Sequence, residues 1–175
     1  GGGRHHFLAA GADDPEYTEF FGARLDIRDL IAEWKNKSPD NQYIWNKTQL
    51  DALNLKQTKH LLGLFEPSHM NYEADRSKDR SGEPSLAEMT KTALGVLQNN
   101  PKGFFLMVEG GRIDHAHHSG NAFRALGDTV AFSDAVRTAM EMTSEQDTLI
   151  IVTADHSHTM TFAGYPARGN PILGK

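Results

Sequence analysis

The sequence contains no cysteine among its 175 residues, so disulfide bonds and thiolate chemistry are excluded within it. It has no apolar run near the ~18 residues that a membrane-spanning helix requires, and no block of Lys or Arg. The net charge of −5 argues against a nucleic-acid or anionic-membrane surface, because such surfaces need basic clusters. An anionic substrate must therefore be held locally, by a metal ion or a few side chains. Internal repeats are also missing, which excludes solenoid architectures.

The apolar pattern of the second half predicts an α/β fold. Two continuous apolar runs, at 103–108 and 149–153, have the form of strands buried on both faces. A long helix is expected between them, from about residue 120 to 142. Its apolar face comprises Phe123, Leu126, Val130, Val136 and Met140. Strand, long helix and strand form the pattern of a parallel crossover in a layered α/β sheet.

Shorter elements are expected in the first half. Residues 1–24 and 66–84 are rich in polar and turn-forming residues and predict irregular structure. Short strands are expected at 43–45 and 60–65. A helix is expected after a cap at Asp26, and its buried stripe comprises Ile27, Leu30, Ile31 and Trp34.

A second helix is expected from residue 86 to about residue 99. Ser85 and Glu88 have the spacing of a capping box, in which each side chain accepts a hydrogen bond from the other's backbone N–H. The expected inner face comprises Leu86, Met89, Ala93, Val96 and Leu97.

Both long apolar runs end in a turn rich in histidine and acid. The first is followed by Glu109–His118 and the second by Asp155–His158, and together these turns hold five of the nine histidines. In parallel sheets, ligands bind beyond the carboxyl ends of the strands. Carboxylate oxygen and imidazole nitrogen together suit a zinc-type ion, whereas all-oxygen positions suit magnesium.

The spacing within the turns indicates which side chains can share an ion. Asp114 and His118 are four residues apart, so both face the same point if the segment is helical. Asp155 and His156 are adjacent, which suits a ligand pair where the backbone is irregular at the end of a strand. Glu109 can reach a third ion.

The simpler alternative is that these turns are solvated polar loops. A lone histidine usually belongs to that class, but two clusters of acid and histidine at successive strand ends favour metal binding. His117 and His158 are expected to support the ligands rather than to bind metal themselves.

The segments Phe104–His118 and Val152–His158 closely resemble the alkaline phosphatases of the animal type. The resemblance extends over nearly the whole chain, because further similar segments follow one another in the family's order: Gly1–Arg4, Tyr43–Thr48, Gly63–Pro67 and Gly164–Gly169. It implies a three-layer α/β/α sandwich with a mainly parallel central sheet. It also implies that residues 1–175 are the central part of one domain, with both ends truncated.

The resemblance implies a phosphate-monoester hydrolase with two zinc ions and one magnesium ion. Asp114 and His118 match ligands of the first zinc, Asp155 and His156 match ligands of the second, and Glu109 matches a magnesium ligand. His115 matches a position beside the substrate, where it contacts phosphate through water.

Animal alkaline phosphatases also carry a calcium site away from the chemistry. Its matches here are Glu16, the backbone oxygen of Phe65, the carboxylate of Glu66, and Glu83. The family has aspartate at the last position, and the loop before it is two residues longer in this chain. Read without the family, Glu16 and Glu83 are ordinary surface acids.

The family's catalytic groups are not all expected within the chain. The serine that becomes phosphorylated, and an aspartate that bridges the second zinc and magnesium, belong upstream of Gly1. The remaining histidine of the first zinc belongs downstream of Lys175. The chain alone is therefore expected to be inactive, although it carries most of the metal ligands.

Two alternative functions remain open from the sequence. One is a related bimetallic phosphodiesterase or sulfatase-like hydrolase, which the missing nucleophile would distinguish. The other is a non-catalytic metal-binding protein, although the ligands Asp114, His118, Asp155 and His156 are all present.

The resemblance also implies a setting for the full-length protein. The family is typically a homodimer at the cell surface, held there by a C-terminal GPI anchor, and acts on small phosphate monoesters. Asn46-Lys47-Thr48 is a glycosylation sequon at a family position, whereas the sequon at Asn36 is weakened by Pro39.

Overall fold

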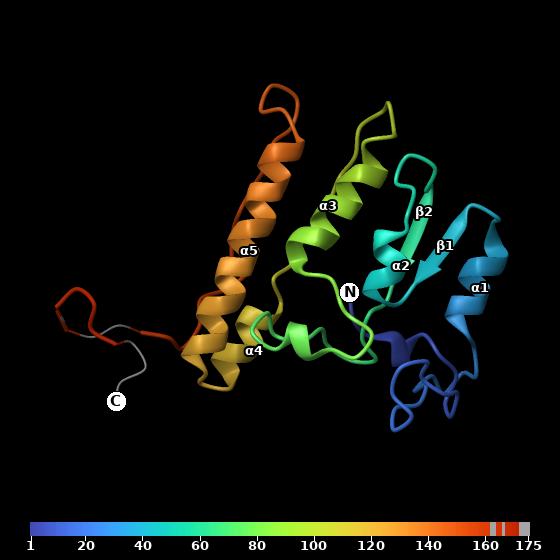
Figure 1. Cartoon of the computed structure of the whole chain (residues 1–175), viewed down its shortest axis with the longest axis horizontal. Coiled ribbons are helices and arrows are strands. Elements are labelled where there is room, and N and C mark those ends of the chain that lie inside the picture. Colours follow the sequence, from blue (N-terminus) through green and yellow to red (C-terminus); the bar gives the residue numbers. More distant parts are fainter. Residues whose placement is uncertain (162–163, 166, 172–175) are drawn as a thin grey trace.

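The computed structural model describes residues 1–161, 164–165 and 167–171 of the chain; Pro166, which belongs to one of the family-like segments, lies outside them. A two-stranded parallel sheet stands beside a group of helices (Figure 1). The elements are α1 (Leu30–Lys37), β1 (Asn41–Ile44), α2 (Lys47–Asp51), β2 (His60–Gly63), α3 (Leu86–Leu97), α4 (Arg112–His118) and α5 (Ala122–Met142), with 3₁₀ turns at Arg4–His6 and Arg76–Lys78.

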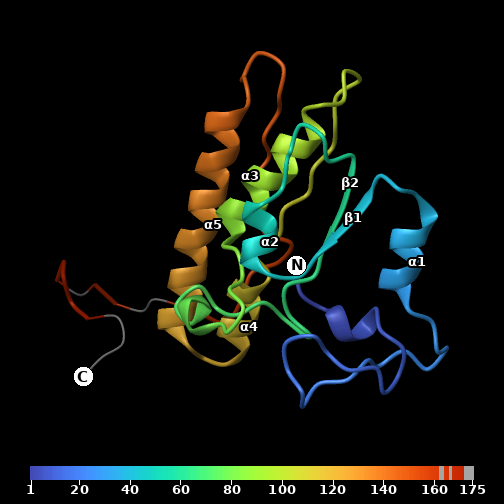
Figure 2. The same ribbon diagram turned by 45° about the vertical axis from the view of Figure 1, so that its right-hand side comes forward.

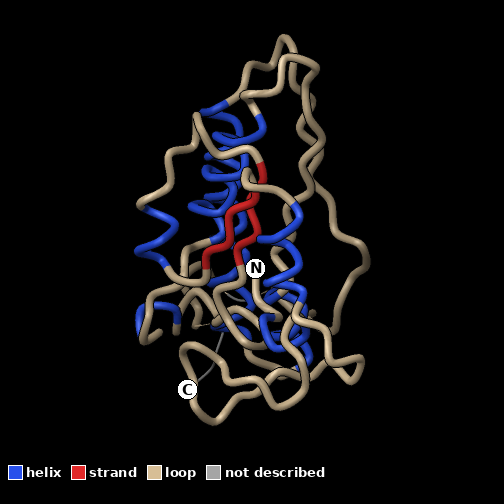
Figure 3. The backbone as a smooth tube through the Cα atoms, turned by 90° about the vertical axis from the view of Figure 1, so that its right-hand side faces the viewer, coloured by secondary structure: helices blue, strands red, loops and turns tan. Residues whose placement is uncertain are grey.

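The sheet confirms the expected α/β class. β1 pairs with β2 in parallel, with Asn41 opposite His60 and Ile44 opposite Gly63, and the two strands lie side by side in Figure 3. The chain between them contains α2, as the short crossover between two parallel strands requires. Both strand predictions in the first half are therefore confirmed, with small differences in their ends.

A small core joins the sheet to α2 and α3. Ile44, Leu50 and Phe65 are buried together, and four partly buried side chains pack against them: Leu53, Leu61, Met70 and Met89. Beside this core lies a cavity of about 400 Å³ whose lining includes Ala93, Val96 and Leu97 of α3. The expected inner face of α3 therefore faces the core and this cavity, while the side chains buried most completely on α3 are Thr90, Thr92 and Leu94.

The predicted caps are confirmed for α3 and corrected for α1. Ser85 and Glu88 form the expected capping box. α1 begins after Asp29, whose side chain accepts hydrogen bonds from the N–H groups of Ile31 and Ala32. Asp26 was the wrong cap, because its carboxylate is occupied by the guanidinium of Arg24 and the N–H of Arg28.

The expected strands at 103–108 and 149–153 are not formed. Within the described residues neither run has a ladder partner, and Phe105, Met107, Leu149 and Ile151 are each at least three-quarters exposed. An apolar run indicates that a segment is suited to burial, but a strand also needs a neighbour with which to exchange backbone hydrogen bonds.

The face by which α5 packs also differs from the expectation. α5 runs alongside α3 in Figures 1 and 2, and these two helices share the largest contact between elements. Ala125 and Ala135 are the buried side chains of α5, whereas Phe123, Val130 and Met140 are more than half exposed. Small side chains let helix axes approach closely, which agrees with the burial of alanines rather than of the larger apolar residues of α5.

The irregular segment 1–24 is organised by one buried cation, the guanidinium of Arg4. Its Nε and Nη2 donate to both oxygens of Asp14 at 2.7 and 2.8 Å, and its Nη1 donates to the carbonyl of Leu64 at 3.0 Å. Nη2 also donates to Glu16 at 3.0 Å, and the guanidinium lies 5.4 Å from the centre of the Trp45 ring. The Arg4 side chain is completely buried, so these partners replace its hydration.

Replacing Arg4 by methionine in the full-length protein should destabilise it by about 3–5 kcal/mol, because Asp14 and Glu16 would remain buried without their cation. Urea unfolding measures the change. Arg28→Met is the matched control, since the Arg28–Glu33 pair is about half exposed and its loss should leave the midpoint nearly unchanged. Equal midpoints for the two variants would contradict the role of Arg4.

Candidate metal centres

The first candidate site is built on the single helical segment α4. Asp114 and His118 lie one turn apart on it, with Nε2 of His118 at 3.4 Å from Oδ2 of Asp114. His158, from the turn after residues 149–153, brings its Nε2 to 3.2 Å from Oδ1 of Asp114. One ligand atom from each of these three residues lies within 4.8 Å of the other two. The structure thus assembles the two histidine-rich turns at one point.

The second predicted ligand pair is only partly gathered there. Nε2 of His156 lies 3.7 Å from Oδ1 of Asp114 and 3.6 Å from Oδ2 of Asp155. The Asp155 side chain is 90% exposed and lies at the edge of the group. The backbone oxygen of Ser157 near Nδ1, followed by the charge of Asp155, raises the pKa of His156.

The atoms of this site fit a zinc-type ion. Oδ1 of Asp114 is buried and accepts no hydrogen bond within the described residues. Such an orphaned carboxylate oxygen is costly unless a cation approaches it. Imidazole nitrogens of His156 and His158 lie near this oxygen, and that of His118 lies near Oδ2 of the same carboxylate. Such a mixed set of nitrogen and oxygen donors is the chemistry that zinc prefers.

His117 and His158 pack against the ligands. Their rings stack with centroids 4.9 Å apart, and the His158 ring also meets the His118 ring edge-on at 4.6 Å. His158 therefore both supports His118 and approaches Asp114 directly, which is more than the supporting position expected from the sequence.

His115 is held beside the site by two residues that the sequence analysis did not single out. Nη1 of Arg112 lies 2.9 Å from its Nδ1, and the His69 ring lies 4.4 Å from its ring centre. Because guanidinium only donates, Nδ1 accepts and Nε2 carries the proton. Burial, then the nearby His69 and Arg112, lower the pKa of His115. The sequence signal for Arg112 was its place one helical turn before His115.

Glu109 lies in the segment that leads into α4. It is exposed, and its carboxylate approaches the backbone at Gly111. In the described part of the chain it shares no group of metal-ligating atoms with the Asp114 site. The structure thus leaves this predicted magnesium ligand apart from the other ligands.

The second candidate site is a buried acidic cluster formed by Glu16, Glu66 and Asp79. One carboxylate oxygen from each lies within 4.8 Å of the others. The Glu16 carboxylate accepts hydrogen bonds from Nη2 of Arg4 at 3.0 Å and from the N–H of Ser81 at 3.2 Å, and the Glu16 side chain is 1% exposed. The cluster joins segment 1–24, the end of β2 and the loop before α3.

The remaining two predicted calcium ligands lie around this cluster. The carbonyl of Phe65 accepts no hydrogen bond within the described residues, so it is free to bind a cation. Glu83 is buried, but both its oxygens face the N–H of Asn71, at 3.0 and 3.2 Å. Asp79 belongs to the cluster although the sequence analysis did not select it. The one indication in the sequence was that its loop is two residues longer than the pattern of the resembled family.

The cluster contains more negative charge than it can hold without a cation. Burial, then the adjacent carboxylate of Asp79, and the charges of Glu83 and Glu16 raise the pKa of Glu66 to about 9. Burial also raises the pKa of Glu83 to about 7. Buried carboxylate oxygens with raised pKa values fit a hard divalent cation such as calcium, which takes oxygen ligands.

Asn46 has a structural role in addition to its sequon. Its Oδ1 accepts a hydrogen bond from the N–H of Gln49 at 2.9 Å and thereby caps α2. The side chain is partly exposed. The cap uses only the oxygen, so the amide nitrogen that would carry a glycan is not needed for it.

Comparisons with known proteins agree on one family. The profile of the alkaline phosphatase family matches residues 1–175. The tissue-nonspecific alkaline phosphatases of Gallus gallus and Rattus norvegicus are 48% and 49% identical over 99% of this chain, and the chain spans about a third (34%) of their length.

Two crystal structures of bacterial enzymes are also similar. The alkaline phosphatase of Thermus thermophilus matches with a TM-score of 0.59 and 38% identity, over 67% of this chain and 24% of that protein. The cold-active alkaline phosphatase of a Shewanella species matches with a TM-score of 0.54 and 28% identity, over 64% of this chain and 26% of that protein.

The raised pKa of Glu66 predicts how stability depends on pH when divalent cations are removed. The folded state keeps a proton on Glu66 up to about pH 9, whereas its ordinary value is 4.5. The stabilisation is therefore full below about 4.5 and is lost as the pH rises toward 9. Urea midpoints of chelator-treated full-length protein should fall across this range, and Glu66→Gln should flatten the profile. A wild-type midpoint that rises with pH there, or an unchanged slope in the variant, would contradict the assignment.

Proposed function

We propose that the protein containing this chain hydrolyses phosphate monoesters, because the chain belongs to the alkaline phosphatase family. The observation that carries the proposal is the convergence of Asp114, His118, His156 and His158 at one point. The two similar crystal structures are both alkaline phosphatases, which supports a monoesterase over the related phosphodiesterases and sulfatases.

In this proposal Asp114 and His118 hold a first zinc ion, and Asp155 and His156 hold a second. Glu109 contributes to a magnesium site. Two such metal ions stabilise the attacking and leaving oxygens of a phosphoryl transfer and generate a nucleophilic hydroxide at moderate pH. The residues of this chain orient one another: α4 fixes the spacing of Asp114 and His118, and His158 supports both.

His115 is the proposed contact to the substrate. Because Arg112 donates to its Nδ1, the Nε2–H is available to donate toward a phosphate oxygen, directly or through water. The lowered pKa favours the neutral ring, in which Nδ1 is engaged by Arg112 and Nε2 carries the hydrogen that donates. Arg112 is itself held over the Tyr72 ring at 3.8 Å, which fixes the direction of its donor groups.

The acidic cluster is the proposed calcium site. Glu16, the Phe65 carbonyl, Glu66 and Glu83 are the residues that the family resemblance assigns to it. Burial of Glu16 and Glu66, and the free Phe65 carbonyl, support a cation at this position. The ion would neutralise the negative charge of these buried carboxylates, which is unfavourable without a cation.

We place the full-length protein at the cell surface, as a glycosylated homodimer with a GPI anchor. This part of the proposal follows from what is typical of animal alkaline phosphatases, and the partly exposed sequon at Asn46 supports it. None of the helices among the described residues has the length and apolar character needed to cross a bilayer.

Asp114→Asn should lower the zinc content of the full-length protein from about two ions per chain toward one, because it replaces the carboxylate that holds the proposed first zinc with His118. Atomic emission measures zinc per chain, and hydrolysis of p-nitrophenyl phosphate should fall by at least about 10²-fold with it. Asp134→Asn is the control, since that half-exposed side chain forms an ion pair with Arg137 on α5. Wild-type zinc content in Asp114→Asn would refute this ligand role.

Protein made by secreting animal cells should carry a glycan at Asn46. Peptide mass spectrometry before and after enzymatic removal of N-glycans detects it, because release converts the modified asparagine to aspartate. Thr48→Ala should abolish the modification while leaving the Asn46 cap of α2 intact. An unmodified Asn46 in protein from such cells would contradict the glycoprotein assignment.

A further inference from the structure

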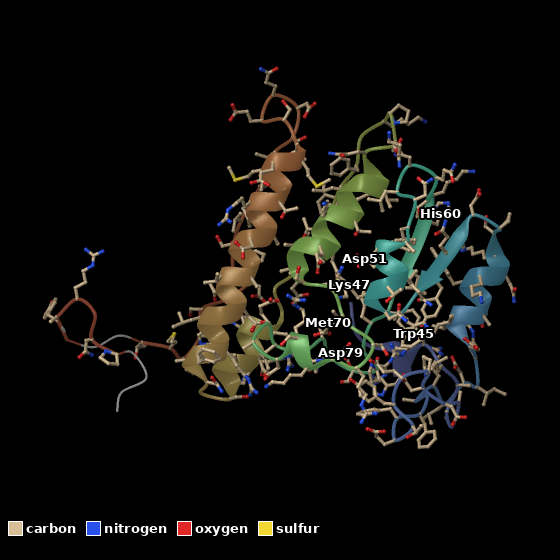
Figure 4. The ribbon with its side chains drawn as sticks, in the orientation of Figure 1. Trp45, Lys47, Asp51, His60, Met70 and Asp79 are labelled. Atoms are coloured by element: carbon tan, nitrogen blue, oxygen red, sulfur yellow. The ribbon has the colours of Figure 1, made fainter. Side chains whose placement is uncertain are left out.

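The acidic cluster does not use the acid that the family pattern assigns to it. Asp79 is the residue that lies with Glu16 and Glu66, within 4.8 Å of both. Glu83, which occupies the family's aspartate position, is outside this group. Asp79 belongs to the loop between β2 and α3 (Figure 4).

The geometry of the Asp79 carboxylate suits a metal ligand. Its Oδ2 is buried and accepts no hydrogen bond within the described residues. Its Oδ1 accepts the hydroxyl of Tyr17 at 3.1 Å, which fixes the carboxylate in one orientation. An unpartnered buried oxygen beside two other carboxylates is unfavourable without a positive charge. A divalent ion removes that cost.

Glu83 is engaged elsewhere. Both its oxygens face the N–H of Asn71, and the side-chain amide of Asn71 donates to Oε1 of Glu66 at 3.2 Å. Glu83 therefore acts on the cluster through Asn71, by orienting Glu66. Withdrawing it to bind an ion would leave the Asn71 N–H without this partner.

We propose that Asp79 is the carboxylate that completes the calcium site, with Glu16, Glu66 and the Phe65 carbonyl, and that Glu83 is a positioning residue. The inference rests on the calcium site of the proposed function. Asp79, in the loop between β2 and α3, thus supplies the third carboxylate of the site. Glu83 supports the site by holding Asn71, which donates to Glu66.

Calcium binding to the full-length protein tests the inference. Equilibrium dialysis with radioactive calcium, at constant saturating zinc and magnesium, gives the number of ions per chain and their Kd. Asp79→Asn should weaken binding by about tenfold or more, because it removes a charged ligand. Glu83→Gln should weaken it by less than about threefold, since the ligand set is retained. Glu19→Gln is the control for loss of one exposed acid in segment 1–24.

Terbium luminescence adds a readout that does not depend on activity. Tyr17 donates to Asp79 and can sensitise a terbium ion bound at this site, so the emission excited through tyrosine should be lost in Asp79→Asn and displaced by calcium in the wild type. Zinc content and phosphatase activity, measured in parallel, report on the first site and on folding.

The possible outcomes separate the two proposals. If wild type binds calcium and Asp79→Asn binds it equally well while Glu83→Gln does not, Glu83 is the ligand and the inference is overturned. Wild type that binds no calcium overturns both the calcium site and the inference, but leaves phosphatase activity untouched. If Asp79→Asn fails to fold, the anomalous signal of terbium in wild-type crystals decides: Asp79 Oδ2 must lie within about 2.6 Å of the ion, and Glu83 in that place would refute the inference.

Discussion

The buried guanidinium of Arg4 is the contact on which the arrangement of the first half depends. A charge removed completely from water must be matched by partners in fixed positions, and here they come from Asp14, Glu16, the Leu64 carbonyl and the Trp45 ring. Segment 1–24 has no regular element beyond one 3₁₀ turn, yet it cannot move away from the end of β2 without exposing these acids. The same guanidinium therefore orders the loop and delivers Glu16 to the acidic cluster.

The two candidate sites differ in their donor atoms and in their exposure to solvent. The cluster around Asp114 is rich in imidazole and partly open to solvent, which agrees with the proposed exchange of substrate there. The cluster around Glu66 is buried and holds only oxygen ligands. If the proposed metal ions bind, a segment of net charge −5 would present a locally positive surface to phosphate, because the field near a bound ion outweighs the net charge.

Features that depend on near neighbours in the sequence could be predicted from it. The capping box of α3 and the pairing of Asp114 with His118 follow from spacings of three and four residues, which a helix makes into contacts. The α/β class was also predictable. The strands expected at 103–108 and 149–153 were not formed, because a strand depends on a partner that no local pattern specifies. Asp79 reaches the acidic cluster because the irregular loop before α3 brings it next to Glu16 and Glu66. The path of an irregular loop leaves no periodic pattern in the sequence, so this contact could not be predicted.

Pro84 links the acidic cluster to α3 through the backbone. It is completely buried between Glu83, which holds Asn71, and Ser85, which caps the helix. Its ring fixes its own backbone angle φ, which removes one of the rotations that could turn Glu83 relative to Ser85. The support that Glu83 gives to Glu66 through Asn71 and the first turn of α3 therefore depend on the same restrained stretch of backbone.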